Sequence, residues 1–546
     1  MRLDYFWIGD YKNLKDVTVD FSEDHWVTVV IGWNGTGKSN VLEALATLFR
    51  DLIMGENEAG AKNKPSFPYR LRYRMHDRWW IHIDADPSRA RNSYQIKIKE
   101  ITEDIPEENK SPEDLGSSIA LSKFRKDQRK YLPRYIFGYY SGTSSRFEDV
   151  FRKYLIRYDK ALRAGKDPGM KRLFYALPVH SQFVLLAFIL QQDEVVKDFL
   201  DQQLGLEKGG IDSVLFVLKQ PPWDKTKDKE IFWGAKGIVR TFLDRLLRIS
   251  LAPIRISRRV EATLWNKKTR GFRYLYVKDL ESLRQLVGSK EPREFFRDIE
   301  STYVSELIEE VRIRVKLRKN DGSVTFRELS EGEQQLLTVL GLLKFTAEEE
   351  SLILLDEPDT HLNPQWCVDY LNLIKNFVGS HDTDRESSHI VLTTHNPLAV
   401  AELVKEQVQI LKRDQETLKV SALLPDIDPR GMGYSGIVTS DMFGLAAAVD
   451  RQTLELLEAK RKLAGKEGPL SVEEREELER INLQLEGYGF RYEMRDPVFA
   501  EYLKARYLDD ERQPEMGRMV NLSIAERKEK ARRLVQQALA KVKQEG

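Results

Sequence analysis

The sequence predicts an α/β fold in which a mixed sheet is flanked by helices, and three patterns carry this prediction. Residues 26–32 (WVTVVIG) form an apolar run that leads into a glycine-rich loop and then into a helical pattern. Residues 351–355 (SLILL) and 389–394 (HIVLTT) are two more apolar runs of strand length, each followed by polar side chains. Residues 60–140 contain strands of alternating polarity between Pro and Gly breaks, which predicts an antiparallel β subdomain.

The composition is that of an ordinary globular protein. The chain has 546 residues, with 41% hydrophobic and 32% charged, and a formal net charge of +1, so any nucleic-acid surface must be a local patch. The longest apolar run, residues 183–190, is too short to cross a bilayer, and residues 1–10 lack a secretory-signal pattern. The single cysteine, Cys367, agrees with a reducing compartment. We therefore expect a cytoplasmic protein without a transmembrane helix.

The glycine-rich loop at residues 32–39 reads GWNGTGKS and matches the phosphate-binding pattern G-x-x-x-x-G-K-[ST] in full. Glycines let successive backbone N–H groups close around a phosphate, the lysine reaches the β and γ oxygens, and the serine hydroxyl ligates Mg²⁺. The helical spacing that follows places a helix N-terminus behind the anion. The residues expected to hold the nucleotide are Asn34, Gly35, Gly37, Lys38 and Ser39.

Three further motifs follow, the first of them about 290 residues downstream. Asp356 and Glu357 follow the strand at residues 351–355, in the Walker B arrangement of a carboxylate for Mg²⁺ and a glutamate that can polarise water. The strand at residues 389–394 is followed directly by His395. Upstream, residues 329–335 (LSEGEQQ) contain the pair Ser330 and Glu333, a capping box that by itself only opens a helix.

The ordered set GWNGTGKS, LSEGEQQ, LLDEP and TTHNP resembles the ATP-binding-cassette ATPases, in the branch that contains the SMC, RecF and overcoming-lysogenization-defect (OLD) ATPases. The resemblance covers about residues 1–150 and 310–420. It implies an ABC-type P-loop ATPase head that uses ATP and Mg²⁺. It also implies that two heads meet head to tail, so that Ser330 and Gly332 of one chain face the γ-phosphate held by Lys38 of the other.

The same resemblance assigns roles to single residues. Glu357 would be the general base, Asp356 and Ser39 would hold Mg²⁺, and His395 would sense the γ-phosphate. Asp359 would lie across the dimer seam, and Lys12, in the aromatic-basic-Asn sequence at residues 11–13, would lie near the nucleotide. The glutamine that completes the Mg²⁺ shell in this family is not identifiable, although Gln95 is a candidate.

We expect four regions. Residues 1–150 and 311–425 form the two halves of the head, residues 151–310 form an insertion, and residues 426–546 form a helical extension. The insertion has no sustained heptad repeat, so we expect a compact helical or mixed lobe rather than a coiled-coil arm. Residues 426–428 (DID) have the spacing of a metal site, but no strand ending in Glu-Gly precedes them, which favours a loop.

Two basic stretches are candidate nucleic-acid surfaces. Residues 255–278 combine cations with aromatic residues, as a phosphate-binding groove requires, but the alternation fits a half-exposed strand equally well. The cations proposed as contacts are Arg255, Arg258, Arg259, Lys267, Lys268 and Arg270. A shorter run at residues 123–130 (KFRKDQRK) is more typical of a solvated helix face.

The segments at residues 432–457, 470–482 and 495–507 resemble the PtuA ATPase family of Septu-type anti-phage systems, some of which are retron-associated. This resemblance implies a homodimer or higher oligomer, a separately encoded HNH nuclease (PtuB-like) under ATP-dependent control, and, in the retron branch, a bound reverse-transcribed DNA. The alternative is a DNA-repair ATPase of RecF type that acts on DNA without a dedicated nuclease. A transporter cassette would need a membrane-coupling partner, and the long insertion argues against it.

Overall fold

The computed structural model describes most of the chain and divides it into two compact units. The described residues are 1–22, 24–101, 116–190, 193–261, 267–318, 323–346, 350–378, 388–414, 416–445, 447–466, 470–488 and 524–545. The first unit, here the head unit, comprises Met1–Ala399 and Glu406–Leu423. The second, here the C-terminal unit, comprises Val400–Lys405 and Leu424–Gly546. The segment at residues 495–507, used in the PtuA resemblance, lies outside the described residues.

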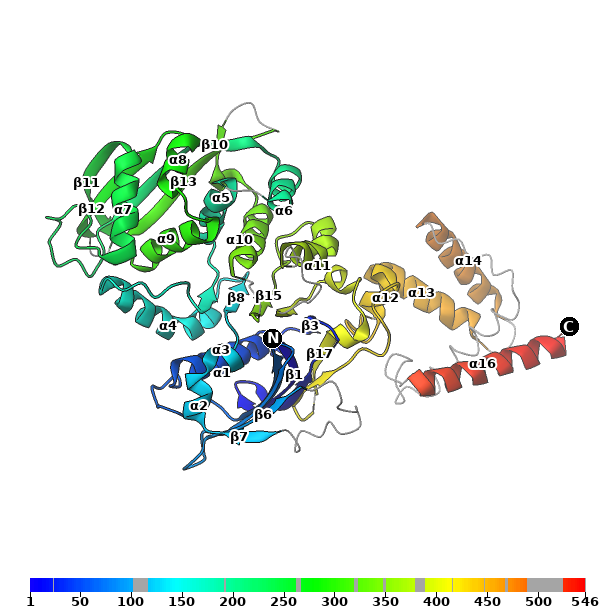
Figure 1. Cartoon of the computed structure of the whole chain (residues 1–546). Coiled ribbons are helices and arrows are strands. Elements are labelled where there is room, and N and C mark those ends of the chain that lie inside the picture. The colour runs from blue at the N-terminus through cyan, green and yellow to red at the C-terminus, as the bar shows by residue number, and fades with distance from the viewer. Residues whose placement is uncertain are drawn as a thin grey trace. The chain divides into compact units, whose positions relative to one another are not determined.

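A seven-stranded sheet forms the centre of the head unit, in the order β18-β17-β3-β16-β15-β8-β9. Figure 1 labels four of its strands, β3, β8, β15 and β17. Its strands are β3 (Val27–Gly32), β8 (Ile136–Tyr140), β9 (Leu173–Tyr175), β15 (Leu352–Asp356), β16 (His389–Thr393), β17 (Val408–Arg413) and β18 (Val420–Leu423). All neighbouring pairs are parallel except β17 with β18. The runs at β3, β15 and β16 are almost entirely buried, because helices cover both faces of a parallel sheet.

The antiparallel subdomain predicted for residues 60–140 is present. It is a six-stranded sheet in the order β2-β1-β4-β5-β6-β7. The strands are β1 (Arg2–Tyr11), β2 (Leu14–Asp20), β4 (Tyr69–Met75), β5 (Trp79–Ala85), β6 (Tyr94–Glu100) and β7 (Ser117–Ile119), and two short helices follow, α2 (Leu121–Lys126) and α3 (Gln128–Tyr131). Strands β4 and β6 bury alternate residues, and the buried face shares one core with helix α1 (Lys38–Met54).

The insertion, expected to be a helical or mixed lobe, contains both helices and a sheet. Its sheet has the order β11-β12-β10-β13-β14. The strands are β10 (Leu206–Lys219), β11 (Leu251–Glu261), β12 (Lys267–Val277), β13 (Ile308–Leu317) and β14 (Ser323–Thr325). The sheet is hard to find in the sequence because β10 carries two adjacent glycines at 209–210 and register shifts that interrupt the alternation of polar and apolar residues.

The remaining helices of the head unit connect these sheets. In the insertion they are α5 (His180–Leu190), α6 (Glu194–Asp198), η3 (Phe199–Gln203), α7 (Gly237–Ile249), α8 (Leu280–Val287) and α9 (Pro292–Val304). The others are α4 (Arg146–Arg163), η4 (Phe326–Glu328), α10 (Glu331–Thr346) and α11 (Pro364–Val378), with η5 (Pro397–Val400) and η6 (Lys405–Gln407) near the unit boundary. No helix in the described ranges is long and apolar enough to cross a membrane.

The C-terminal unit is helical, as expected. Its helices are α12 (Gly433–Thr439), α13 (Arg451–Ala464), α14 (Val472–Gly487) and α16 (Ile524–Glu545). Asp450 caps α13 by accepting from the N–H of Thr453, and Ser471 forms a capping box with Glu474 at the start of α14. Apolar side chains such as Leu485 and Leu534 are buried.

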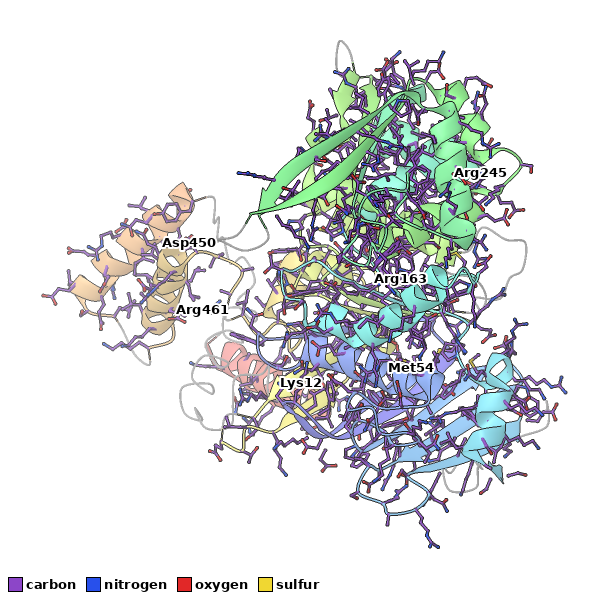
Figure 2. All side chains as sticks on the ribbon, turned by 90° about the vertical axis from the view of Figure 1, so that its left-hand side faces the viewer. Lys12, Met54, Arg163, Arg245, Asp450 and Arg461 are labelled. Atoms are coloured by element: carbon purple, nitrogen blue, oxygen red, sulfur yellow. The ribbon has the colours of Figure 1, made fainter. Side chains whose placement is uncertain are left out.

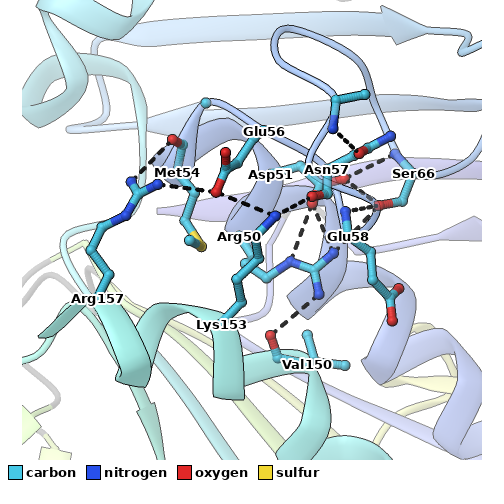
Figure 3. A network of polar contacts seen from close by, with 12 residues as sticks. Arg50, Asp51, Met54, Glu56, Asn57, Glu58, Ser66, Val150, Lys153 and Arg157 are labelled. Carbon is cyan, nitrogen blue, oxygen red and sulfur yellow. Dashed lines mark hydrogen bonds and ion pairs between the residues drawn. The ribbon is translucent and has the colours of Figure 1, made fainter. Parts of the chain in front are cut away.

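A polar network fixes the end of α1 against α4 (Figure 3). Arg50 pairs with Asp51 and also donates to the carbonyl of Val150 in α4, while Ser66 donates to Asp51 through both its N–H (2.9 Å) and its hydroxyl (2.7 Å). Burial raises the pKa of Asp51, and Arg50 and Ser66 oppose the rise. Because its charges are paired, the network can be buried, and it anchors the helix that begins at the phosphate-binding loop.

A buried ion cluster joins the insertion to the edge of the central sheet. Glu300 of α9 forms an ion pair with Lys171, which precedes β9, and its Oε2 lies 2.7 Å from Nε2 of His180 at the start of α5. The ammonium of Lys171 also lies 4.1 Å from the centre of the Phe174 ring. All three charged or polar side chains are at most 5% exposed. Despite burial, His180 and Lys171 lower the pKa of Glu300 to about 2.

We expect Glu300→Gln to lower the free energy of unfolding by about 3–5 kcal/mol, because Lys171 is then left buried without a counter-ion. In the wild-type chain, the stabilisation that ionised Glu300 provides is fully present above the ordinary glutamate pKa of 4.5. It is lost as the pH falls towards 2, where Glu300 becomes protonated. Chemical denaturation at several pH values measures both effects. As a control, Glu309→Gln removes the more exposed pair with Lys219 and should cost about 1 kcal/mol or less. Equal losses in the two variants would contradict the assignment.

Candidate functional site

Three strands of the central sheet end at one edge and bring the separate motifs together. β16 pairs in parallel with β3, with Thr393 opposite Val30, and with β15, with Thr393 opposite Asp356. The loop after β3, the acidic pair at the end of β15 and the histidine after β16 therefore emerge side by side at the carboxyl ends of the strands. This edge is where ligands bind in open parallel sheets.

The phosphate-binding loop adopts a conformation that depends on its glycines. Gly37, which precedes α1, has φ 102°, and a Cβ there would lie 2.8 Å from Oδ1 of Asn13. Gly32 has φ 151°, and a Cβ there would lie 2.5 Å from the carbonyl oxygen of Leu411. Asn34 and Gly35 are exposed, so the outer part of the loop faces solvent. The loop can therefore present backbone N–H groups at the start of a 17-residue helix, which is an anion site.

Lys38 is held inside this loop. Its Nζ donates to the carbonyl oxygen of Gly32 (2.8 Å), and the residue is buried. Burial lowers the pKa of Lys38, while the negative charges of Glu357 and Asp356 oppose the decrease. The ammonium is thus placed between the loop and the acidic pair, where a nucleotide phosphate would sit.

Asp356 and Ser39 form a contact that suits a divalent cation. The hydroxyls of Ser39 and Thr393 both donate to the Asp356 carboxylate. Burial raises the pKa of Asp356 to about 6, and these hydrogen bonds oppose the rise. A carboxylate beside a hydroxyl is a hard oxygen donor set, and Mg²⁺ uses one or two such ligands together with phosphate oxygens and water. The residues therefore fit Mg²⁺.

Glu357 follows Asp356 in a strained backbone conformation with φ 51°. Its N–H donates to the carbonyl oxygen (3.0 Å) and the hydroxyl (3.1 Å) of Thr393, which holds it in this conformation. Its Oε1 lies 3.3 Å from Nδ1 of His395, and both side chains reach solvent. The structure thus brings together Glu357 and His395, as the sequence predicts, on the open side of the Mg²⁺-type ligands.

The helix that carries Ser330 is attached to the turn after Asp356. Ser330 and Glu333 form the predicted capping box, with Glu333 accepting from the N–H of Ser330 (2.7 Å). The Gln335 side chain donates to the carbonyl of Pro358, and a Cβ on Gly332 would lie 2.6 Å from the carbonyl oxygen of His361. Ser330 is exposed, whereas Gly332 is packed against this turn.

Asp359 does not project from the surface of the single chain. It is 3% exposed, and the hydroxyl of Thr394 donates to its Oδ2 (2.8 Å). Burial raises its pKa, which the bond from Thr394 opposes. Within one chain, Asp359 therefore links the turn after β15 to the residue before His395.

Lys12 and its neighbours contact the loop and helix α1 directly. Lys12, labelled in Figure 2, pairs with Glu43 of α1. Asn13 donates to the carbonyl oxygen of Gly35 (3.0 Å) and accepts from Asn40 (2.6 Å). The sequence alone gives Asn13 and Asn40 no role. The aromatic-basic-Asn sequence at residues 11–13 marks this segment as a candidate. Only the fold shows that the turn after β1 contacts the phosphate-binding loop.

Gln95 does not lie beside the acidic pair, so it is not the missing Mg²⁺-shell residue. It is exposed on β6, opposite Asp84, in the six-stranded sheet. The strand next to β15 on the other side is β8, where Tyr140 lies opposite Asp356. The N–H of Ser141 donates to the carbonyl of Asp356 (3.2 Å), so Tyr140 and Ser141 occupy this position.

The basic stretch at residues 255–278 forms the β11–β12 hairpin at one edge of the insertion sheet. Arg255, Arg258, Arg259 and Lys268 are exposed and Arg270 is half-exposed, and none of these side chains has an acidic partner among the described residues. Arg258 stacks over the rings of Phe272 (4.3 Å) and Tyr274 (5.5 Å). The side chain of Lys267 lies outside the described ones.

Other candidates have structural roles. Arg273, which also belongs to the basic stretch, is buried and pairs with Asp228. Residues 426–428 lie in a loop, where Asp428 accepts from the N–H of Lys405. No group of three metal-ligating side chains occurs among the described residues. Cys367 is buried.

Comparison with family models identifies ATPase domains at both ends of the head unit. A model described as "AAA ATPase domain" matches residues 1–112, and one described as "AAA domain, putative AbiEii toxin, Type IV TA system" matches residues 244–401. The chain therefore has an ATPase head assembled from two separated parts of the sequence.

The chain is similar in sequence to a retron ATPase and to a Septu protein. It is 22% identical over 459 residues to the "Retron Vc95 probable ATPase" of Vibrio cholerae, covering 80% of this chain and 78% of that protein. It is 25% identical over 225 residues to the "Septu protein PtuA" of Bacillus mycoides, covering 38% of this chain but only 30% of that protein. The SMC head domain from Thermotoga maritima aligns over 78% of this chain and 99% of its own, at 13% identity and a TM-score of 0.31.

We expect Asn13→Ala to weaken ATP binding about tenfold, because the loop loses the hydrogen bond that fixes the carbonyl of Gly35. Titration with a fluorescent ATP analogue measures the change. Asn482→Ala, an exposed helical position in the C-terminal unit, is the control and should leave the affinity unchanged. Identical affinities for the two variants would show that Asn13 does not shape the loop.

Proposed function

We propose that this chain is the ATP-hydrolysing regulatory subunit of an anti-phage defence complex, in which two heads close on nucleotide and control a separately encoded HNH nuclease. The observation that carries the hydrolytic part is the convergence of Lys38, Ser39, Asp356, Glu357 and His395 at one sheet edge. The defence context is supported by the similarity to the Septu and retron proteins.

In the proposed reaction the backbone N–H groups of the loop and Lys38 bind the phosphates, while Ser39 and Asp356 would hold Mg²⁺. Bound Mg²⁺ supplies charge neutralisation at the β and γ oxygens. Glu357 accepts a proton from a water molecule whose oxygen attacks the γ-phosphorus, and the bond to the β-phosphate oxygen breaks to give ADP and phosphate. His395, 3.3 Å from Glu357, orients this carboxylate and can donate to a γ oxygen.

The proposal of two closed heads rests on the exposed start of α10. Ser330 lies on the surface at the N-terminus of a 16-residue helix, where the helix dipole favours an anion. The carboxylate of the capping box, Glu333, accepts a hydrogen bond from the N–H of Ser330. A second copy that supplied Ser330 and Gly332 to the γ-phosphate would complete the site, with Asp359 near the seam.

The β11–β12 hairpin is the proposed nucleic-acid surface. A two-stranded ribbon has the dimensions of the DNA major groove, and its unpaired arginines can neutralise phosphates. Retron-derived DNA is a ligand whose backbone carries such phosphates. A DNA-repair ATPase would bind DNA through the same hairpin, so the presence or absence of a nuclease partner separates the two functions.

Glu357→Gln should bind ATP but hydrolyse it at least 100-fold more slowly, and it should accumulate as a dimer, because the proton acceptor is lost while the phosphate ligands remain. Lys38→Ala should lose ATP binding. Phosphate release and size-exclusion chromatography with ATP measure these outcomes. Unchanged hydrolysis in Glu357→Gln would remove this residue as the base.

Purification from native cells should recover a nuclease of the HNH type with the wild-type chain. Recovery of DNA but of no nuclease, together with DNA-stimulated ATPase activity, would favour the repair function instead.

Arg255→Ala combined with Arg258→Ala should weaken DNA binding and make the affinity less dependent on salt. The logarithmic slope should fall by about 0.9 for each phosphate that the variant no longer neutralises.

A further inference from the structure

A second group of cations surrounds a cavity on the head unit that has no part in the ATPase site. The cavity has a volume of about 680 Å³ and is lined by His76, Arg125, Lys126, Asp127, Gln128, Arg129, Lys130 and Arg172. Most of these residues come from the basic run at residues 123–130, which the sequence alone assigns to a solvated helix face. The volume lies in the range of small-molecule sites.

The charge of the lining is strongly one-sided. Five arginine and lysine side chains face a single carboxylate, Asp127. Lys126, Arg129 and Lys130 form no ion pair with any acidic side chain in the described part of the chain. Arg125 differs from them, because its Nη1 donates to the carbonyl of Gly55 and to the side chain of Asn63, whereas its buried Nε and Nη2 have no hydrogen-bond partner among the described residues. Lys126, Arg129 and Lys130 are exposed, so these three charges are open to an anion from solution, which can form charge-assisted hydrogen bonds with them.

The base of the cavity is rigid. Arg172 donates to the carbonyl of Pro133 through Nε (3.1 Å) and Nη2 (2.8 Å) and to the side chain of Gln128 through Nη1 (2.5 Å). His76 donates from Nε2 to the carbonyl of Arg129 (3.1 Å). These bonds fix the backbone of the α2–α3 segment, so the cationic side chains project from a preformed frame.

Aromatic rings lie at the edge of the same group. The ammonium of Lys130 is 4.7 Å from the centre of the Trp79 ring and 5.8 Å from that of Tyr131. Burial lowers the pKa of Arg172 to about 10, and the like charge of Arg129 adds to this effect.

We infer that this cavity binds a phosphate-rich anion of the nucleotide class, at a site separate from the phosphate-binding loop. The cavity lies beside Pro133 and Arg172, which precede β8 and β9, whereas the ATPase residues follow the opposite, carboxyl ends of the strands. Several cations suit a chain of phosphates better than a single one, and an adjacent ring can take a base. The phosphates could belong to a free nucleotide or to the 5′ end of a nucleic-acid strand.

The test uses the full chain with Lys38→Ala, so that the ATPase site does not bind the probe. Isothermal titration with inorganic tripolyphosphate should show one saturable site. Adding Lys126→Ala and Arg129→Ala should weaken it at least tenfold, whereas adding Lys123→Ala, an exposed lysine on the same helix that does not line the cavity, should leave it unchanged.

Equal affinity in the double variant and the Lys123→Ala control, or no saturable binding, would overturn the inference. Circular dichroism of the variants excludes loss of folding as the cause. A 5′-phosphorylated oligonucleotide and a free nucleoside triphosphate, titrated into the same proteins, then distinguish the two sources of the phosphates. Lys38 is replaced in every variant of this test, so a negative result would not count against the proposed ATPase function. Conversely, evidence against the ATPase function would leave this test valid.

Discussion

The nucleotide site depends on the parallel register of three strands. Thr393 lies opposite Val30 on one side and Asp356 on the other, and this single pairing sets the phosphate-binding loop next to the acidic residues. Thr393 then bonds to Asp356 through its hydroxyl and to the N–H of Glu357 through its carbonyl oxygen. A parallel strand that slipped by one residue would turn these side chains to the opposite face, so the chemistry requires this one register.

The same edge is connected mechanically to the helix that carries Ser330. The carbonyl groups of Pro358 and His361, in the turn after Glu357, contact Gln335 and Gly332 at the start of α10. Asp359 in the same turn bonds to Thr394, next to His395. A change of ligand at the γ-phosphate position would therefore reach α10 through packed backbone and hydrogen bonds rather than through a flexible loop. In the proposed arrangement of two heads, this connection would link the nucleotide to the surface that carries Ser330.

Local motifs determine what can be predicted from the sequence. The phosphate-binding loop, the acidic pair, the capping box and the antiparallel subdomain each depend on residues that are near one another in the chain, and periodicity or spacing reveals them. Asn13 escapes such reasoning because its hydrogen-bond partner, Gly35, lies 22 residues further along the chain, outside any local pattern. Gln95 is a candidate by residue type alone, whereas the position beside Asp356 is set by the order of strands, which brings β8 there. The irregular register of β10 obscures the sheet in the insertion.

The split arrangement of the head has a consequence for synthesis on the ribosome. Strand β3 ends at Gly32, but its two neighbours, β16 and β17, are made roughly 360 residues later and are complete only at Arg413. At about 5–20 residues per second, the phosphate-binding motif emerges roughly 20–70 s before the strands that hold it in place. A nascent chain that stops between Ser39 and His389 carries every residue of the loop but neither of the two strands that flank β3 in the finished sheet.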